Sequence, residues 1–269
     1  MSSSLSANKL ICFESNRFGG RLKYFGDEAK AEYWDDLWEE LEDSVDYARF
    51  SAGHFPHQLR RTFLRWVPRG LRVLEAGCGM GTFTVAANAL GYDAHGVDYA
   101  PKIIEKLIER FPTINFFTGD VRNLSHIEDN SYDAIYSPGV CEHFESGPEA
   151  VLREAHRIVR PGGFVVVSTP CFNDLQKAMN RTGKYSRSPN GQFYQYAFSR
   201  REMTNILQEL AFDVMQVRQY GTFLTLTDNV PVLSRLTPMR VKTAIAFGLD
   251  SMPVVTRFGH TCIWVARKK

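Results

Sequence analysis

The stretch LEAGCGMG, residues 74–81, places glycine at three alternating positions, Gly77, Gly79 and Gly81. The apolar run LRVLEA, which favours a strand, leads into it, and TFTVAANAL, which favours a helix, follows it. Glycine is unfavourable inside regular secondary structure. Three glycines here therefore indicate a backbone conformation that other residues avoid, or another group that approaches the backbone closely. A glycine-rich turn between a strand and a helix lets a ligand approach the backbone and exposes the first N–H groups of the helix. The sequence therefore predicts a ligand-binding turn.

The alternation of strand and helix continues on both sides of this turn. The predicted strands are short segments at residues 71–76, 93–98, 114–118, 132–137, 164–169, 212–219 and 261–267. The predicted helices between them cover residues 81–90, 101–111 and 148–160. Such an alternation implies a mostly parallel sheet that is covered by helices on both faces. We therefore predict an α/β fold with a seven-stranded, mostly parallel sheet.

Other segments depart from this alternation. Residues 27–50 are acidic and carry large apolar side chains at helical spacing, so we expect an N-terminal helix there and a second helix at 55–67. Residues 170–198 lack periodicity, are rich in basic and aromatic side chains, and are typical of a lid inserted over a site. Residues 221–260 are apolar and dotted with proline.

These features predict a mobile tail at residues 1–8 and a single domain over 9–269. Its core is expected at about 55–170 and 199–220. The lid or acceptor segments are expected at about 9–54, 170–198 and 221–260.

Composition narrows the functional class. The 269 residues include 32 basic and 30 acidic side chains, a net charge of +2, so no nucleic acid partner is expected. The five cysteines form no CxxC pair, which argues against a disulfide framework or a zinc site and favours a reducing compartment. No run approaches the ~18 apolar residues of a membrane-spanning helix, and residues 1–8 do not resemble a signal peptide. We expect a cytoplasmic protein without a transmembrane segment.

The spacing of the glycines argues against a dinucleotide site. The pattern G-x-G-x-x-G would place the third glycine at residue 82, which is Thr82, whereas the third glycine is Gly81. Asp98 ends a predicted strand 21 residues after Gly77, where a carboxylate can accept from both hydroxyls of a ribose. Asp120, in TGDV, ends the next strand and can accept from an exocyclic amine such as that of adenine. These strand ends would line one crevice.

The combination resembles the class I S-adenosylmethionine-dependent methyltransferases. The matching motifs are Glu75 to Gly81, Asp98, Gly119-Asp120, YDAIYSPGVCEHF and RIVRPGGFVVVSTP. The resemblance covers about residues 70–170 strongly and 199–220 weakly. Within the class, CEHF resembles the small-molecule branch that includes the ubiquinone-pathway O-methyltransferases, where a Glu-His pair follows the fourth strand. The resemblance implies a Rossmann-like fold and S-adenosylmethionine as cofactor.

The resemblance also implies roles for individual residues. The cofactor-binding residues that it implies are Glu75, Gly77, Cys78, Gly79, Gly81, Asp98, Tyr99, Asp120, Val121 and Ser137. The glycines would form the floor under the methionine part, and Glu75 would orient the turn and help hold the methionine amine. Asp98 would bind the ribose and Tyr99 would pack beside the adenine. Asp120 would hold the adenine amino group, and the backbone N–H of Val121 would meet the ring.

Catalysis in this class requires mainly the positioning of an acceptor against an already activated methyl group. Ser137 would lie at the mouth to which the methyl group points. His143 is the candidate general base, because its ordinary pKa near 6.5 suits proton uptake at neutral pH. A structural histidine and a metal ligand are the alternatives. Some relatives bind a divalent ion through Glu-x-x-Glu-His, but Gly139 replaces the first glutamate here, so no metal is expected.

The leading functional prediction is methyl transfer to a small-molecule acceptor, at oxygen rather than nitrogen or carbon. The basic residues of segment 170–198 favour a carboxylate or phosphate on the acceptor, and its aromatic residues favour an apolar part. Two alternatives stay open. The basic, aromatic stretch 177–201 is compatible with an RNA or protein substrate, and the chain is also compatible with a non-catalytic protein that binds S-adenosylmethionine.

Overall fold

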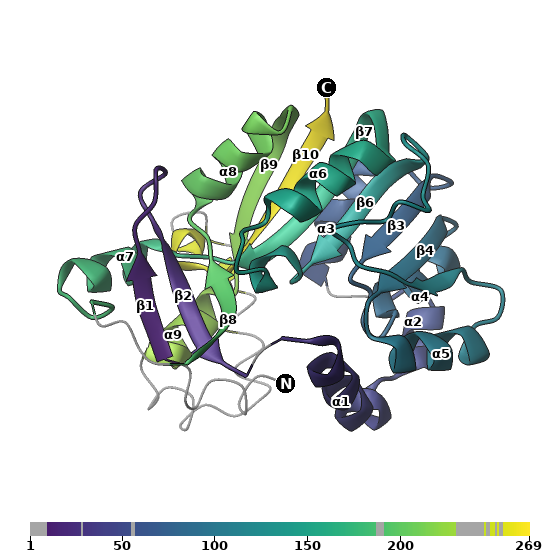
Figure 1. Cartoon of the computed structure of the whole chain (residues 1–269), viewed down its shortest axis with the longest axis horizontal. Coiled ribbons are helices and arrows are strands. Elements are labelled where there is room, and N and C mark those ends of the chain that lie inside the picture. The colour runs from purple at the N-terminus through teal and green to yellow at the C-terminus, as the bar shows by residue number, and fades with distance from the viewer. Residues whose placement is uncertain are drawn as a thin grey trace.

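The main body of the chain is built on a seven-stranded sheet (Figure 1). The structure, a computed structural model, describes residues 10–27, 29–54, 57–186, 191–229, 245, 248–250, 252 and 255–269. The strands of this sheet are β3 (Arg72–Ala76), β4 (Asp93–Asp98), β5 (Phe116–Thr118), β6 (Tyr132–Pro138), β7 (Val159–Pro170), β9 (Phe212–Tyr220) and β10 (Thr261–Lys268). Their order is β5-β4-β3-β6-β7-β10-β9, and β10 alone among them runs antiparallel to its neighbours. The predicted sheet is confirmed.

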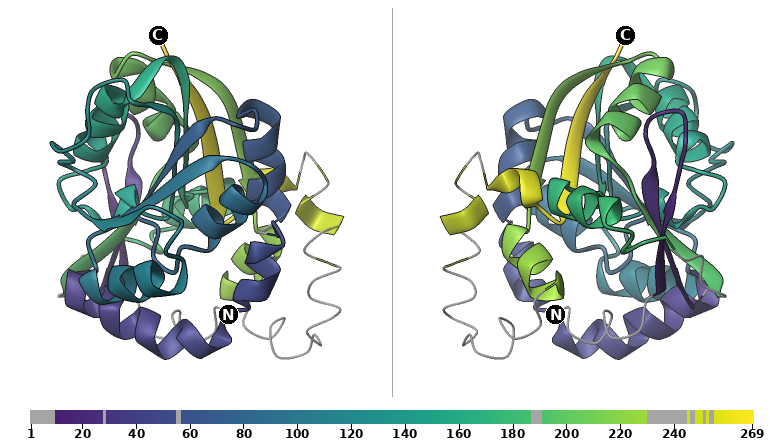
Figure 2. Two further views of the ribbon diagram at one scale, coloured as in Figure 1. Left: turned by 90° about the vertical axis from the view of Figure 1, so that its right-hand side faces the viewer. Right: turned by 90° about the vertical axis from the view of Figure 1, so that its left-hand side faces the viewer.

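Helices cover both faces of this sheet, as the two side views show (Figure 2). They are α3 (His57–Trp66), α4 (Thr82–Ala89), α5 (Pro101–Arg110), α6 (Glu149–Ile158) and α8 (Arg200–Glu209). Each predicted helix of the alternation agrees with one of these to within two residues. The prediction for the strand at 164–169 was too short, because β7 begins at Val159 and includes Pro161, Gly162 and Gly163.

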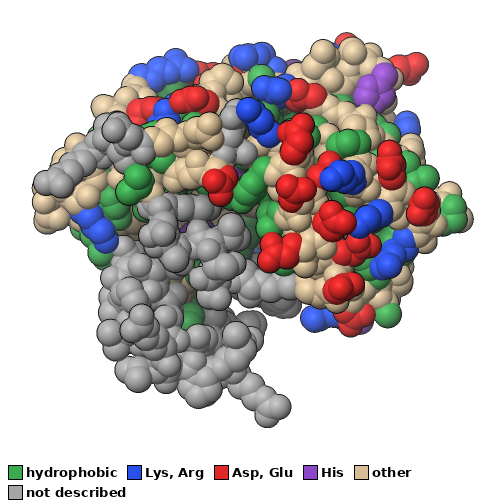
Figure 3. All heavy atoms as spheres, turned by 60° about the horizontal axis from the view of Figure 1, so that its bottom comes forward, with side chains coloured by type: hydrophobic (Ala, Val, Ile, Leu, Met, Phe, Trp, Pro, Cys, Tyr) green, Lys and Arg blue, Asp and Glu red, His purple; other side chains and the backbone are tan. Residues whose placement is uncertain are grey.

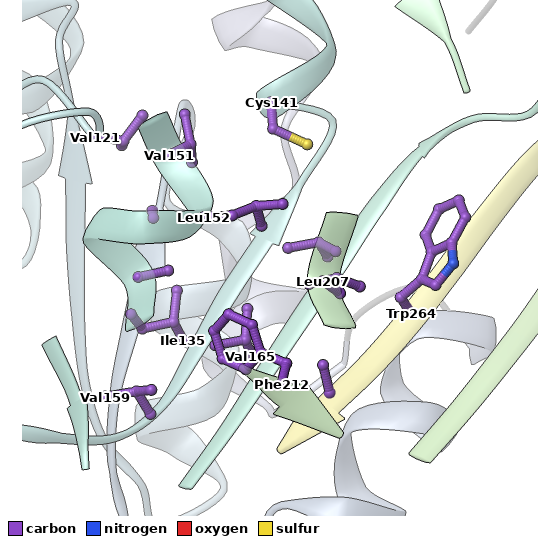
Figure 4. Packing of buried hydrophobic residues seen from close by; sticks show 14 of the residues in the cluster. Val121, Ile135, Cys141, Val151, Leu152, Val159, Val165, Leu207, Phe212 and Trp264 are labelled. Atoms are coloured by element: carbon purple, nitrogen blue, oxygen red, sulfur yellow. The ribbon is translucent and has the colours of Figure 1, made fainter. Parts of the chain in front are cut away.

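The alternation of side chains along the strands produces two apolar layers. Val165 and Val167 of β7 belong to the cluster that contains the buried residues of α6 and α8 (Figure 4). Val166, between them, belongs to the opposite cluster, with residues of α3 and α4. Because neighbouring residues of a strand point to opposite faces, the run of three valines requires burial on both sides. The run of three valines in this strand therefore reflects its central place in the sheet.

The prediction of one continuous helix over residues 27–50 was wrong. The segment forms α1 (Ala31–Leu41), a short 3₁₀ helix at Glu42–Ser44, and α2 (Tyr47–Ser51). The break occurs because Val45 is extended, with φ −90° and ψ 114°, and because Asp46 starts a new helix by accepting from the backbone N–H of Arg49. A residue at an N-cap has a non-helical backbone conformation, so Asp46 begins a new helix and does not continue the one before it.

Segment 170–198 is also more regular than predicted. It contains α7 (Asp174–Arg181), which begins with a capping box between Asn173 and Gln176, and β8 (Gln192–Ala197). Strand β8 pairs with β2 (Arg21–Gly26), and β2 pairs with β1 (Leu10–Glu14), so a second, antiparallel sheet stands beside the main one (Figure 1).

Two further predicted segments, residues 221–260 and 1–8, lie partly or wholly outside the described residues. Segment 221–260 begins with α9 (Thr222–Asn229) and contains a 3₁₀ helix at Thr256–Phe258, and most of the residues between them lie outside the described residues. The expected tail, residues 1–8, lies outside them as well.

On the face that Figure 3 shows, described acidic and basic side chains are interspersed and no large basic patch is seen. Among the described residues, no helix is long and apolar enough to cross a membrane.

Candidate functional site

A cavity of about 820 Å³ lies at the carboxyl ends of β3, β4 and β6. Its volume is in the range of small-molecule sites, and such sites occur at this edge of open α/β sheets. The residues that line it are Phe25, Ala29, Lys30, Ala31, Glu32, Trp34, Trp38, Gly77, Asp98, Tyr99, Asp120, Val121, Arg122, Gly139, Val140, His143, Phe144, Glu145, Ser146, Gly191, Gln192 and Phe193. The cavity therefore brings together the turn, the two aspartates, α1 and the second sheet.

Helix α1 forms one wall because it is fixed to the start of α5. The carboxylate of Asp35, which is buried, accepts from the backbone N–H of Lys102 at 3.1 Å. Trp34 and Trp38 on the same helix pack against the cluster that contains the apolar side chains of α5. The two indole rings are stacked, with centroids 5.5 Å apart. Both rings line the cavity.

The turn glycines all have left-handed backbone conformations, with φ of +81° at Gly77, +46° at Gly79 and +64° at Gly81. A Cβ on Gly77 would lie 2.3 Å from Cγ2 of Val140, and a Cβ on Gly79 would lie 2.9 Å from Cζ2 of Trp38. The side chains that approach the turn this closely belong to the chain itself. Glycine is therefore required here both by φ and by the packing of the cavity wall on the turn.

Glu75 lies beneath the turn and does not line the cavity. One oxygen of its buried carboxylate accepts from the backbone N–H of Thr84 at 2.9 Å and from the Thr84 hydroxyl at 2.6 Å. Burial raises the pKa of Glu75 to about 8. The contacts tie the end of β3 to the first turn of α4, so Glu75 orients the turn from behind.

Asp98 holds the opposite side of the turn and lines the cavity. Its carboxylate accepts from the backbone N–H of Gly79 at 2.8 Å and from that of Ala100 at 3.0 Å. Burial raises its pKa, and these backbone hydrogen bonds act in the opposite direction. Each oxygen keeps acceptor capacity toward the cavity, because a carboxylate offers about four acceptor positions. Next to it, the Tyr99 hydroxyl donates to the carbonyl of Ala29, which joins β4 to the segment before α1.

Asp120 and Val121 lie at the far end of the same cavity, beside a residue that the sequence analysis missed. The guanidinium of Arg122 donates to both oxygens of Asp120, through Nε at 3.0 Å to Oδ1 and through Nη2 at 2.7 Å to Oδ2. The Arg122 side chain lowers the pKa of Asp120 through these hydrogen bonds. The tetrapeptide GDVR contains this signal, since an arginine two residues after an aspartate can return to it.

His143 reaches the cavity from a short 3₁₀ helix at Cys141–His143 that follows β6. Its Nδ1 lies 2.9 Å from the carbonyl oxygen of Tyr194. Since a carbonyl oxygen only accepts, Nδ1 carries the hydrogen and donates a hydrogen bond to it. The ring meets Trp34 and Tyr194 edge to face, with centroids 5.0 and 5.1 Å apart. In the neutral ring this arrangement leaves the lone pair on Nε2.

The chain matches a family model described as a methyltransferase domain over residues 45–217. The chain belongs to this family. The match confirms the resemblance drawn from the glycine turn, the two aspartates and the CEHF motif.

Individual relatives of this methyltransferase are distant. A ubiquinone biosynthesis O-methyltransferase of Xanthomonas axonopodis is 28% identical over 42% of this chain and 49% of its own length. A malonyl-[acyl-carrier protein] O-methyltransferase of Pectobacterium atrosepticum is 33% identical over 40% of this chain and 42% of its own length. The chain thus spans less than half the length of these curated relatives.

A solved structure gives the same fold. The phosphoethanolamine N-methyltransferase 2 of Haemonchus contortus, in complex with S-adenosylhomocysteine, has a TM-score of 0.56 at 16% identity. The comparison covers 92% of this chain and 62% of that one. This likeness supports the Rossmann-like assignment of the methyltransferase and does not extend to its substrate.

The remaining residues predicted for the cofactor site do not line the cavity. Cys78, Gly79, Gly81 and Ser137 are not among the residues that line it. Ser137 is buried, and its hydroxyl donates to the carbonyl of Ala76 at 2.8 Å, an interaction that joins β6 to β3.

Segment 170–198 contributes to the cavity differently from what we expected. Its contributions are Gly191, Gln192 and Phe193, and its basic residues Lys177 and Lys184 do not line the cavity. Strand β8 therefore presents an aromatic ring to the cavity, and the basic charges expected there are elsewhere.

Glu142 lies beside His143 and is almost completely buried, with 2% of its surface exposed. Its Oε2 has no hydrogen-bond partner within the described part of the chain, and burial raises the pKa of Glu142 to about 8. Glu145, two residues after His143, is paired with Lys23 at 2.7 Å. Among the described residues, no group of three or more acidic, histidine or cysteine side chains is arranged to hold a metal ion.

Proposed function

We propose that this methyltransferase binds S-adenosylmethionine in the cavity at the ends of β3 and β4 and transfers its methyl group to a small-molecule acceptor. The observation that supports this most strongly is that one cavity joins Gly77 of the turn to Asp98 and Asp120 at the ends of successive strand segments. Membership of the methyltransferase family supports the reaction class.

The side chains of the cavity fit an adenosyl group. The carboxylate of Asp98 keeps acceptor capacity for the ribose hydroxyls, and Tyr99 offers an aromatic ring beside it. Asp120, whose carboxylate is held ionised, accepts from the adenine amino group, and Val121 offers its backbone N–H to the ring. When bound, the cofactor supplies a sulfonium methyl group that a nucleophile can displace in line.

The other wall of the cavity receives the acceptor. It carries Phe25, Phe144 and Phe193 together with His143. Aromatic rings exclude water and pack against apolar parts of a substrate. His143, held by the Tyr194 carbonyl, takes a proton at Nε2 from an acceptor hydroxyl as the methyl group is transferred.

Transfer to oxygen is the form of the reaction that we propose. It is supported by the names of two relatives, the ubiquinone and the malonyl-carrier O-methyltransferases. An N-methyltransferase shares the fold, so the acceptor assay must include amines as well as alcohols, phenols and carboxylates.

Calorimetry with S-adenosylhomocysteine tests the cofactor site. The wild-type protein is expected to bind it, and Asp98→Ala is expected to bind at least tenfold more weakly, because two hydrogen bonds to a carboxylate and the support of Gly79 are lost. Asp213→Ala on the exposed start of β9 is the matched control and should bind normally. Equal affinity of Asp98→Ala and wild type, with both folded, would falsify the site.

Methyl transfer is tested separately with S-adenosylmethionine labelled in the methyl group. A small, extractable labelled product from an alcohol, phenol or carboxylic acid library supports the proposal. Label that enters only amines refutes the oxygen assignment, and label that stays on RNA or protein refutes the small-molecule assignment. His143→Gln should lower kcat far more than it weakens binding of S-adenosylhomocysteine.

A further inference from the structure

Arg122 connects two parts of the cavity that the proposed function treats separately. Toward the turn, it forms a two-point ion pair with Asp120, and its own backbone N–H donates to Oδ1 of Asp120 at 2.9 Å. Toward the acceptor wall, its guanidinium lies over the ring of Phe144, 4.8 Å from the centroid. All three side chains line the cavity.

These contacts determine the orientation of the Asp120 carboxylate. A planar guanidinium that meets both oxygens fixes the carboxylate plane, which a lysine ammonium does not. Oδ1 accepts from the Arg122 backbone N–H, Oδ2 accepts from Nη2, and the single Nε proton is shared between the two oxygens, at 3.0 Å from Oδ1 and 3.1 Å from Oδ2. Three protons therefore reach a carboxylate that offers about four acceptor positions, and Oδ2, whose one unshared donor is Nη2, keeps capacity for a further donor.

The carboxylate is also accessible from the cavity. The Asp120 side chain is 42% exposed, so its remaining acceptor position is not covered by the chain. Phe144 limits where the guanidinium can move, because a cation over an aromatic face is attracted to the ring. Without the guanidinium, only the backbone N–H of residue 122 would hold the Asp120 carboxylate, through Oδ1.

We propose that Arg122 is the positioning residue of the adenine subsite: it holds the Asp120 carboxylate so that Oδ2 accepts from the 6-amino group of the cofactor. This inference rests on the proposed function. By holding Asp120, Arg122 lets the site distinguish adenine from a purine that lacks the 6-amino group.

The test compares two ligands by calorimetry. One is S-adenosylhomocysteine, and the other is its analogue in which hydrogen replaces the 6-amino group. The wild type should prefer the amino form by roughly tenfold or more, the usual effect of a hydrogen bond to a charged acceptor. Arg122→Gln should reduce this preference to below about threefold, with most of the loss on the amino form. Arg122→Lys keeps the charge but not the two-point contact, and it should lose most of the preference too.

Controls separate positioning from general damage. Arg153→Gln removes an exposed arginine of α6 and should keep the full preference. Asp120→Ala should abolish the preference, and Arg122→Gln added to it should change the ratio no further, because both act on one hydrogen bond. Circular dichroism checks that each variant is folded, and Arg122→Lys serves as the test if the glutamine variant is not.

Several outcomes overturn the inference. Arg122→Gln weakening both ligands equally would mean a merely structural role, and an unchanged ratio in either Arg122 variant would mean that the ion pair does not position Asp120. If the wild type binds neither ligand, the proposed function itself fails. If it binds both equally, only the adenine subsite fails.

Discussion

Glu142→Gln should change how the stability of the protein depends on pH. Glu142 is buried beside His143, one of its oxygens has no partner within the described residues, and its pKa is raised from 4.5 to about 8 by burial. The folded state therefore holds a proton that the unfolded chain releases above pH 4.5. Stability from this group is complete below that pH and is lost progressively as the pH rises toward 8. Glutamine has a similar shape and does not titrate.

The size of the effect follows from proton linkage. One pKa unit corresponds to about 1.36 kcal/mol, so between pH 5.5 and 7.5 Glu142 should lower the free energy of unfolding by about 2.7 kcal/mol. Glu75 and Glu202, whose pKa values are also raised by burial, contribute equally to wild type and variant. The difference between the two proteins therefore isolates Glu142.

Urea unfolding at pH 5.5, 6.5 and 7.5 measures this difference. The midpoint of Glu142→Gln should rise relative to that of wild type by roughly 1 M across the range. Glu105→Gln, on the exposed face of α5, should follow the wild type because its solvation hardly changes on unfolding. Parallel curves for wild type and Glu142→Gln would refute the reasoning, since Glu142 would then be ionised in the folded protein.

Two more predictions concern the turn and the surface network. Gly79→Ala should lower the melting temperature and weaken S-adenosylhomocysteine binding, because its Cβ would lie 2.9 Å from Trp38 in a left-handed conformation; an unaffected melting curve would contradict the packing. Arg157→Gln should lower the free energy of unfolding by about 2 kcal/mol in urea, because the guanidinium donates to the carbonyls of Leu124 and Ile127 and pairs with Glu154. A loss under about 0.5 kcal/mol would place that network among ordinary surface pairs.

The parts of the structure that the sequence predicted are those with local causes. Strand β4 was predicted with its observed bounds, because the short stretch DAHGVD stands between two helical segments and ends at Asp98. The turn after β3 was predicted because its glycines are needed where they stand. The meeting of Asp98 and Asp120 in one cavity follows from parallel topology alone.

The parts that could not be predicted depend on distant partners. Strand β8 was not recognised because its pairing, Phe25 with Phe193, joins residues far apart in the chain. The positions of Lys177 and Lys184 outside the cavity follow from the packing of α7, which their charge does not encode. Arg122 was not predicted, because its position two residues after Asp120 permits the ion pair but only side-chain geometry decides whether it forms.

The place of β10 in the main sheet has a consequence for how the molecule is assembled. This strand follows β9 in the chain yet lies between β7 and β9, and among the described strands β9 pairs with β10 alone. During synthesis, β9 emerges before the strand that attaches it to the sheet, so its edge stays unpaired until β10 arrives. The strands at the edge of the proposed cofactor site, β3 to β6, emerge much earlier. A nascent chain thus contains these strands before its main sheet can be completed.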